Sequence, residues 1–136
     1  MSPVDALEVA LRARLVAFAP LTALVPPELI GDRHGLPHEL PCIIIGDGQE
    51  VPAGISFERR HVHAFTNLHI WDRMPNLGTV KELAELVRDA LRGVELQPEG
   101  YRLLDLSWSG ARYLRDPSGK AHAVVTLEAL LEEPRS

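Results

Sequence analysis

The chain has 136 residues, of which 46% are hydrophobic and 24% charged, and its formal net charge at pH 7 is -5. A chain of this length buries roughly two-thirds of its unfolded surface, so a single domain spanning residues 1–136 is expected to fold without a disulfide framework or a structural metal. The acidic balance and the scarcity of aromatic residues argue against a protein that grips nucleic acid, because phosphate binding requires a basic surface.

The first predicted element is an amphipathic helix. Ser2 suits the N-cap, Pro3 suits the first helical position, and Pro20 ends the pattern. Between them, apolar residues recur at three-to-four spacing: Val4, Leu7, Leu11, Leu15 and Phe18. Residues 21–25 add a short turn, and the glycines and prolines of residues 30–41 predict irregular structure with one short edge strand.

Two strands are predicted next. The apolar run Cys42–Ile45 predicts a short buried strand that ends at Gly46-Asp47-Gly48, and residues 47–59, which lack periodicity, predict an exposed, mobile loop. Residues 60–71 alternate and predict the central strand. One face carries Val62, Ala64, Thr66, Leu68 and Ile70, and the other carries His61, His63, Phe65, Asn67, His69 and Trp71.

The last third of the chain predicts a helix followed by a β-hairpin. The helix spans about residues 79–92, and the hairpin joins residues 101–115 to residues 121–131 through the turn Asp116-Pro117-Ser118-Gly119. In the first strand of the hairpin, Leu104, Leu106, Trp108 and Leu114 are expected to share a face. The element order predicts an α+β two-layer sandwich, an antiparallel or mixed sheet with two helices on one face and a C-terminal β-hairpin.

Cysteine usage and hydropathy indicate where the protein is made. Cys42 has no partner in the chain and lies in an apolar run, which predicts a buried thiol and a reducing, intracellular origin. No stretch approaches the roughly 20 apolar residues of a spanning helix, and the N-terminus lacks the features of a signal peptide. We therefore expect a protein made in the cytoplasm with no membrane partner.

Histidine is the residue type that offers a chemical alternative. His61 and His63 project from one strand face at a spacing that lets two ligands share a metal, but a third ligand must come from another segment, because His69 lies roughly 20 Å further along the strand. A small metal-binding protein that uses His61 and His63 is therefore one hypothesis. The other is a sheet face half buried by a loop or a partner. No catalytic motif is present, so no catalytic residue, enzyme activity or cofactor is predicted.

A protein-protein interface is the second possible role for the same strand face. Aromatic side chains mixed with polar groups are typical of interfaces, whereas Phe65 and Trp71 can also simply cover their own sheet. The loop predicted at residues 47–59 adds Phe57 as an anchor with charged residues around it. The predicted interface therefore consists of Glu50, Phe57, Glu58, Arg59, His61, His63, Phe65, His69 and Trp71.

Several segments, taken in order, resemble a known family. They are the helix Ala6–Leu15, the segments Ile30–Arg33 and Pro41–Asp47, the strand Asn67–Arg73 with the Ala/Leu-rich helix that follows it, and Ser109–Pro117 before the last strand. Together they resemble the tail-completion or tail-terminator proteins of long-tailed bacteriophages, prophages and gene transfer agents. The resemblance covers nearly the whole chain.

The resemblance implies a structural virion protein at the head-tail junction. Such a protein forms a homo-oligomeric ring, typically a hexamer, that caps the head-proximal end of the tail tube. It stops polymerisation of the tail tube protein and joins the tail to a head-side stopper or connector protein. DNA passes through the axial channel without sequence-specific binding, and an acidic protein suits that passage because like charges repel. A head-side stopper or connector ring protein is the alternative within the same structural class.

Overall fold

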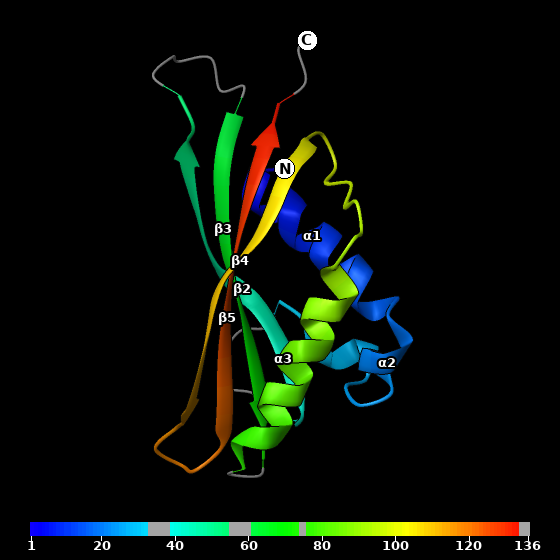
Figure 1. Cartoon of the computed structure of the whole chain (residues 1–136), viewed down its shortest axis with the longest axis vertical. Coiled ribbons are helices and arrows are strands. Elements are labelled where there is room, and N and C mark those ends of the chain that lie inside the picture. The colour runs from blue at the N-terminus through cyan, green and yellow to red at the C-terminus, as the bar shows by residue number, and fades with distance from the viewer. Residues whose placement is uncertain (33–38, 55–60, 74–75, 134–136) are drawn as a thin grey trace.

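The computed structural model describes residues 1–32, 39–54, 61–73 and 76–133. Its sheet has the strand order β1-β2-β3-β5-β4, in which β1 runs parallel to β2 and all other neighbours are antiparallel. The strands are β1 (Ile30–Gly31), β2 (Cys42–Pro52), β3 (His61–Asp72), β4 (Arg102–Arg115) and β5 (Ala121–Glu132). The helices α1 (Pro3–Val16), α2 (Ala19–Thr22) and α3 (Leu77–Leu91) lie on one side of the twisted sheet (Figure 1). The predicted α+β class, mixed sheet and C-terminal hairpin are confirmed.

Both long helices begin at a side-chain cap. The cap of α1 is the predicted Ser2, whereas the cap of α3 is Asn76, and α3 begins at Leu77, two residues before the predicted start. The Ser2 hydroxyl accepts a hydrogen bond from the backbone N–H of Asp5 at 3.2 Å, and the Asn76 side chain accepts one from Gly78 at 2.8 Å. α1 ends before Pro20 as expected, and the short turn predicted after it is the single turn of α2. None of the helices in the described segments is long and apolar enough to cross a membrane.

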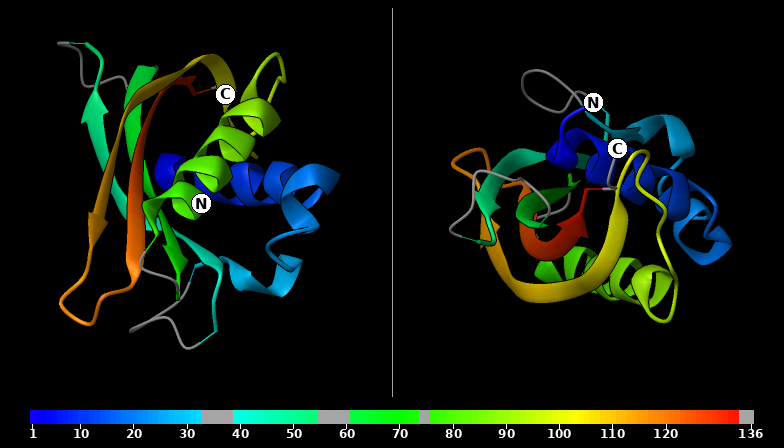
Figure 2. Two further views of the ribbon diagram at one scale, coloured as in Figure 1. Left: turned by 60° about the horizontal axis from the view of Figure 1, so that its bottom comes forward. Right: turned by 90° about the horizontal axis from the view of Figure 1, so that it is seen from above.

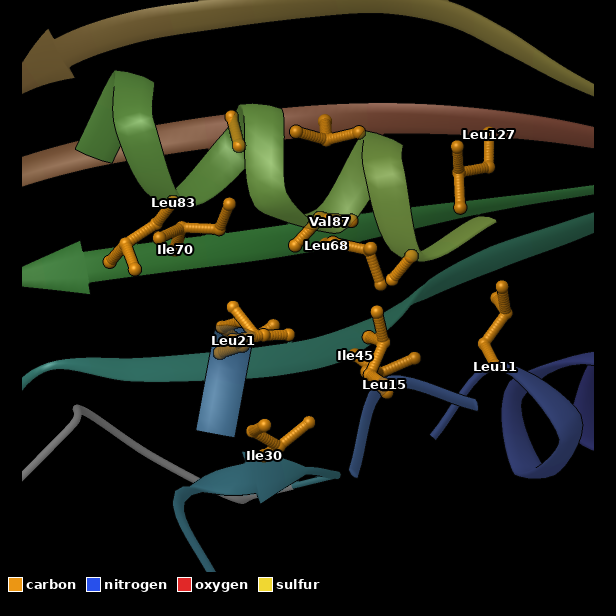
Figure 3. Packing of buried hydrophobic residues seen from close by; sticks show 14 of the residues in the cluster. Leu11, Leu15, Leu21, Ile30, Ile45, Leu68, Ile70, Leu83, Val87 and Leu127 are labelled. Atoms are coloured by element: carbon orange, nitrogen blue, oxygen red, sulfur yellow. The ribbon is translucent and has the colours of Figure 1, made fainter. Parts of the chain in front are cut away.

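The hydrophobic core lies between the helices and the sheet. Leu11 and Leu15 of α1, Leu83 and Val87 of α3, and the inward residues of the central strands are almost completely buried. In Figure 3 the labelled side chains of α1, α2 and α3 point toward those of Ile45, Leu68, Ile70 and Leu127 on the sheet. The inward face of β3 is the predicted one, because alternation along this strand is unbroken.

The end of β2 differs from the prediction. The strand does not stop at Ile45 but continues to Pro52, which pairs with Val62 of β3. A β-bulge between Gly46 and Gln49 shifts the register, and Asp47 within it adopts a left-handed backbone conformation with φ of 58°. The prediction of a loop at residues 47–59 is therefore wrong for residues 47–52. The bulge contains two glycines, and its sequence resembles that of a turn. Residues 55–59 of that loop lie outside the described residues.

The inward face of β4 also differs from the prediction. The residues that pair with the buried face of β5 are Leu103, Leu106, Trp108, Ala111 and Tyr113. Leu104 and Leu114, expected on this face, are instead 40% and 39% exposed. Register shifts between Leu103 and Asp105 and between Trp108 and Gly110 each insert one residue. Strict alternation therefore assigns part of the strand to the wrong face.

Candidate interaction surface

The face of the sheet that bears no helix carries most of the predicted interface (Figure 2). We call the outward row of β3 and the row of β5 paired with it the open face. Its residues are His61, His63, Phe65, Asn67, His69 and Trp71 of β3 and His122, Val124, Thr126, Glu128, Leu130 and Glu132 of β5. All of them are half-buried, because neighbouring side chains of the twisted sheet cover one another.

One end of the open face is a stack of rings joined by hydrogen bonds. Trp71 and His122, which are register partners, stack with ring centroids 3.8 Å apart and planes 9° apart. His122 Nε2 lies 3.1 Å from His69 Nδ1, and His69 Nε2 lies 2.7 Å from the Asp47 carboxylate. With Asp47 ionised and the His69 ring neutral, His69 donates from Nε2, so its Nδ1 accepts a hydrogen bond from the N–H at His122 Nε2. The bulge of β2 is thus tied to β3 and β5.

The His122 imidazole is neutral at neutral pH. Burial above all, with smaller effects of the nearby His69 and Arg112, lowers its pKa to about 4 against the opposing effect of Asp116. A neutral ring suits the stack on Trp71, since a charged imidazole there would lose hydration. The stack of Trp71, His122 and His69 with Asp47 therefore serves as a structural contact near pH 7. Each of its two hydrogen bonds needs one proton between its two heteroatoms, so the contact does not require a charged His122.

The other end of the open face pairs histidines with carboxylates. His61 Nε2 lies 3.1 Å from Glu132 Oε2, and His63 Nδ1 lies 3.3 Å from Glu128 Oε1. The second contact lacks the geometry of a hydrogen bond, so the attraction is electrostatic and requires protonated His63. Between the two ends, the Thr126 hydroxyl donates to the Asn67 side-chain oxygen at 2.8 Å. This half of the surface offers polar groups and the Phe65 ring to a partner.

The metal hypothesis lacks a third ligand. His61 and His63 do lie on one face, but each is matched with a different glutamate of β5. Within the segments that the structure describes, no three His, Cys, Asp or Glu side chains are placed to hold a metal ion together. Cys42 is buried, as expected for a core thiol. His34 and His38 have the i,i+4 spacing of a helical metal site, but Gly35 and Pro37 between them argue against a helix there, and both histidines lie outside the described residues.

The predicted interface residues separate into three groups. His61, His63, Phe65, His69 and Trp71 lie together on the open face. Glu50 does not join them: it lies on the helix side of β2, where its carboxylate accepts a hydrogen bond from the backbone N–H of Val4 at 3.0 Å. Phe57, Glu58 and Arg59 fall outside the described residues. The β5 row was not included in the predicted interface, although its alternation places His122, Thr126, Glu128 and Glu132 on one side.

The fold defines a class of small α+β proteins, with helices on one side of a mixed sheet and a polar, aromatic open face on the other. The family model for tail completion protein gp17 matches residues 9–132, and the chain belongs to this family. It is therefore a structural component of the tail of a phage or phage-like particle. The resemblance predicted from the sequence is confirmed.

Two solved structures are similar in fold. A chain from the virion of a native gene transfer agent particle superposes with a TM-score of 0.80 at 23% identity, covering 97% of this chain and 99% of that chain. The bacteriophage SPP1 gp17 protein superposes with a TM-score of 0.60 at 21% identity, covering 93% of this chain and 88% of that chain. A search of curated proteins finds no match.

Proposed function

We propose that the protein forms a ring, most simply a hexamer, at the head-proximal end of the tail tube, where it ends tube polymerisation and joins the tail to the head. The observation that carries this proposal is the match of the tail completion family to residues 9–132, nearly the whole chain. The similarity of fold to a chain of a gene transfer agent virion, over almost the full length of both, supports it.

The charge of the chain suits a ring through which DNA passes. Its net charge of -5 repels the phosphate backbone, so DNA moves through the axial channel without being held there. A head-side stopper or connector ring would need the same property. The tail completion family favours the tail side of the junction, and the ring is therefore assigned to the end of the tail tube.

The open face is the surface that we assign to the contact with the tail tube protein or the head-side ring. It combines the half-buried aromatic rings of Phe65 and Trp71 with histidines and carboxylates and contains no lysine, a composition typical of interfaces. The helix side, by contrast, is occupied by the core of the subunit itself.

Native mass spectrometry and negative-stain imaging of the purified protein test the ring directly. A closed oligomer with a central opening is the expected result. Removing the protein from the particle should give tails of abnormal length that are not joined to heads. A protein that stays monomeric even beside tail tube protein, or particles that join normally without it, would contradict the proposal.

Substitution on the open face tests the partner contact separately. Phe65→Ser should leave rings intact and reduce the number of joined particles, because the partner loses an aromatic contact worth about 2 kcal/mol when it is central to an interface. Leu24→Ser is the matched control, since Leu24 is 47% exposed and lies on the helix side next to α2. Normal joining of heads and tails in particles that carry Phe65→Ser would contradict the assignment of the open face to this contact.

A further inference from the structure

A hollow of about 300 Å³ lies beside the first half of α1, on the side of the molecule where β1 and β2 form the sheet edge. Met1, Val9 and Ile45 supply its apolar surface, and Asp5, Glu8 and Asp32 supply carboxylates. Met1 is 66% and Val9 57% exposed, the two largest values among the bulky apolar side chains of the described residues. We call this site the α1 hollow. Met1 and Val9 line the same hollow, and exposed apolar side chains grouped in this way mark a surface that a partner covers.

The α1 hollow is negatively charged. Glu8 is partly buried, and burial together with the neighbouring carboxylates of Asp5, Asp32 and Asp47 raises its pKa despite a hydrogen bond from Thr66. Arg12, which also lines the hollow, is engaged elsewhere, because its guanidinium donates to the backbone oxygen of Ile30 at 2.8 Å and to that of Pro27 at 3.3 Å. A fitting partner therefore presents an aliphatic side chain next to positive charge.

The chain itself carries such a segment at the opposite edge of the sheet. Leu114, near the end of β4, is 39% exposed and lies between the exposed residues Arg112 and Arg115. Leu114 projects on the same side of the sheet as the open face, since it pairs with His122 of β5. Arg112 projects on the same side as Leu114, since it pairs with Val124, whereas Arg115 pairs with Ala121 of the buried face and projects on the other side. We call Arg112 and Leu114 the hairpin end. Its combination of one aliphatic side chain and one arginine complements the α1 hollow.

We propose that the hairpin end of one copy docks in the α1 hollow of the next copy, with Leu114 against Val9 and Arg112 facing the carboxylates. This inference rests on the proposed ring and names the surfaces that build it. β4 and the β1–β2 side are opposite ends of the strand order, so the contact joins two different patches. Such head-to-tail contacts repeat from copy to copy and close into a ring when the rotation between copies permits.

Two variants, each defective in one patch, test the contact. Val9→Gln removes the apolar floor of the hollow without adding charge, and Leu114→Asp places a carboxylate opposite those of the hollow. Each alone should weaken self-association by about 30-fold or more, the loss expected for a central interface residue. Mixed together, the two variants should form heterodimers and nothing larger, because the Val9→Gln copy keeps an intact hairpin end and the Leu114→Asp copy keeps an intact hollow.

Matched controls separate the contact from a general effect of polarity. Leu104→Asp introduces the same charge on the same strand at a site of nearly equal exposure. Leu24→Gln makes the same kind of change as Val9→Gln at an exposed position in the turn after α2. Both controls should assemble as the wild type does. Native mass spectrometry reports the oligomers, and thermal unfolding confirms that each variant is folded.

The possible outcomes distinguish this contact from the ring itself. Wild-type rings together with intact rings of Val9→Gln or Leu114→Asp would overturn the docking of the hairpin end while leaving the ring in place. Equal loss of assembly by Leu104→Asp, or growth of the mixture beyond dimers, would also overturn it. A wild-type protein that stays monomeric beside tail tube protein would overturn both the ring and this contact.

Discussion

Asp47 shows how one residue of the bulge in β2 is held in an unfavourable conformation. Its left-handed backbone is uncommon for residues other than glycine, although aspartate tolerates it better than most. The bulge points its carboxylate at His69 Nε2, 2.7 Å away, and His69 in turn meets His122. Side chains from β2, β3 and β5 are thus joined in one chain of hydrogen bonds across the open face.

The pKa of His122 makes stability depend on pH. In the folded protein burial lowers this pKa to about 4, whereas the unfolded chain has the ordinary value of about 6.5. As the pH falls from about 6.5 to 4, the unfolded chain binds a proton that the folded protein does not, so stability is lost across this window. His122→Phe keeps a ring stacked on Trp71. It should reduce the slope of the unfolding free energy against pH by an amount equivalent to up to about one bound proton. Denaturant unfolding of both proteins between pH 4 and 7.5 measures it.

Equal pH slopes for wild type and His122→Phe would contradict the assignment of this effect to His122. The comparison is between two proteins at each pH, so groups that titrate equally in both cancel. Glu8 has the opposite effect in the lower part of the range, because its folded pKa is raised above 4.5 and its protonated form is favoured on folding. Its contribution is the same in both proteins, since the substitution lies on the other face of the sheet.

Gly48 allows β2 to approach the start of α1. A Cβ atom at this position would clash with Cγ1 of Val4 and would lie 3.4 Å from the backbone oxygen of Phe65. Gly48→Ala should therefore destabilise the protein by about 1–3 kcal/mol, the usual cost of overpacking. The double variant Gly48→Ala/Val4→Ala should recover part of the loss, because it removes the methyl group that the added Cβ atom would meet. Urea unfolding measures both, and a double variant less stable than Gly48→Ala would refute the clash.

At the scale of elements, α1 is attached to β3 by a polar contact within an apolar interface. The hydroxyl of Thr66, which is completely buried, donates to the Glu8 carboxylate at 2.7 Å. Hydrogen bonds to a charged acceptor contribute more than neutral ones, and here burial raises the pKa of Glu8 against the effect of this bond. The contact fixes the position of α1 along β3, which apolar packing alone does not specify.

Thr66→Val should destabilise the protein by about 1.5–3 kcal/mol near pH 7, because the partly buried carboxylate loses its donor. Thr126→Val is the matched control on the open face, where the acceptor is the neutral Asn67 side chain, and it should cost about 0.5–1.5 kcal/mol. The difference between the two variants should shrink as the pH falls and Glu8 becomes protonated. Thermal unfolding at pH 7 and pH 4 measures this, and a difference that grows in acid would contradict the role of Glu8.

The elements differ in how far the sequence predicts them. Helix caps and unbroken alternation depend on neighbouring residues alone, so α1, β3 and β5 are predicted with the correct buried faces. The bulges of β2 and β4 depend on how two strands pair, and this is not visible in the period of either strand. For the same reason the site is predicted in part. The β3 row follows from alternation, whereas the ring stack with Asp47 requires three strands to be aligned.

At the scale of the whole molecule, the apolar core joins every layer. Buried side chains from all three helices contact those of β2, β3 and β5 in one continuous cluster, from Leu7 in α1 to Leu131 in β5. A chain with one such cluster is expected to unfold in a single cooperative transition. The prediction of a single domain at residues 1–136 can therefore be tested by measuring whether the protein unfolds in one cooperative transition.

Leu11→Ala in α1 and Leu83→Ala in α3 should lower the same transition. Each removes a side chain that is at most 1% exposed, and such truncations cost about 2–5 kcal/mol because the remaining cavity collapses only in part. Circular dichroism follows the helices, and the fluorescence of Trp71 and Trp108 follows the two sides of the sheet. In either variant both probes should report one midpoint. Separate midpoints, with the helical signal lost before the tryptophan signal, would mean that the helices and the sheet unfold as independent units, and a ring built from contacts between α1 and β4 would then lack a rigid subunit.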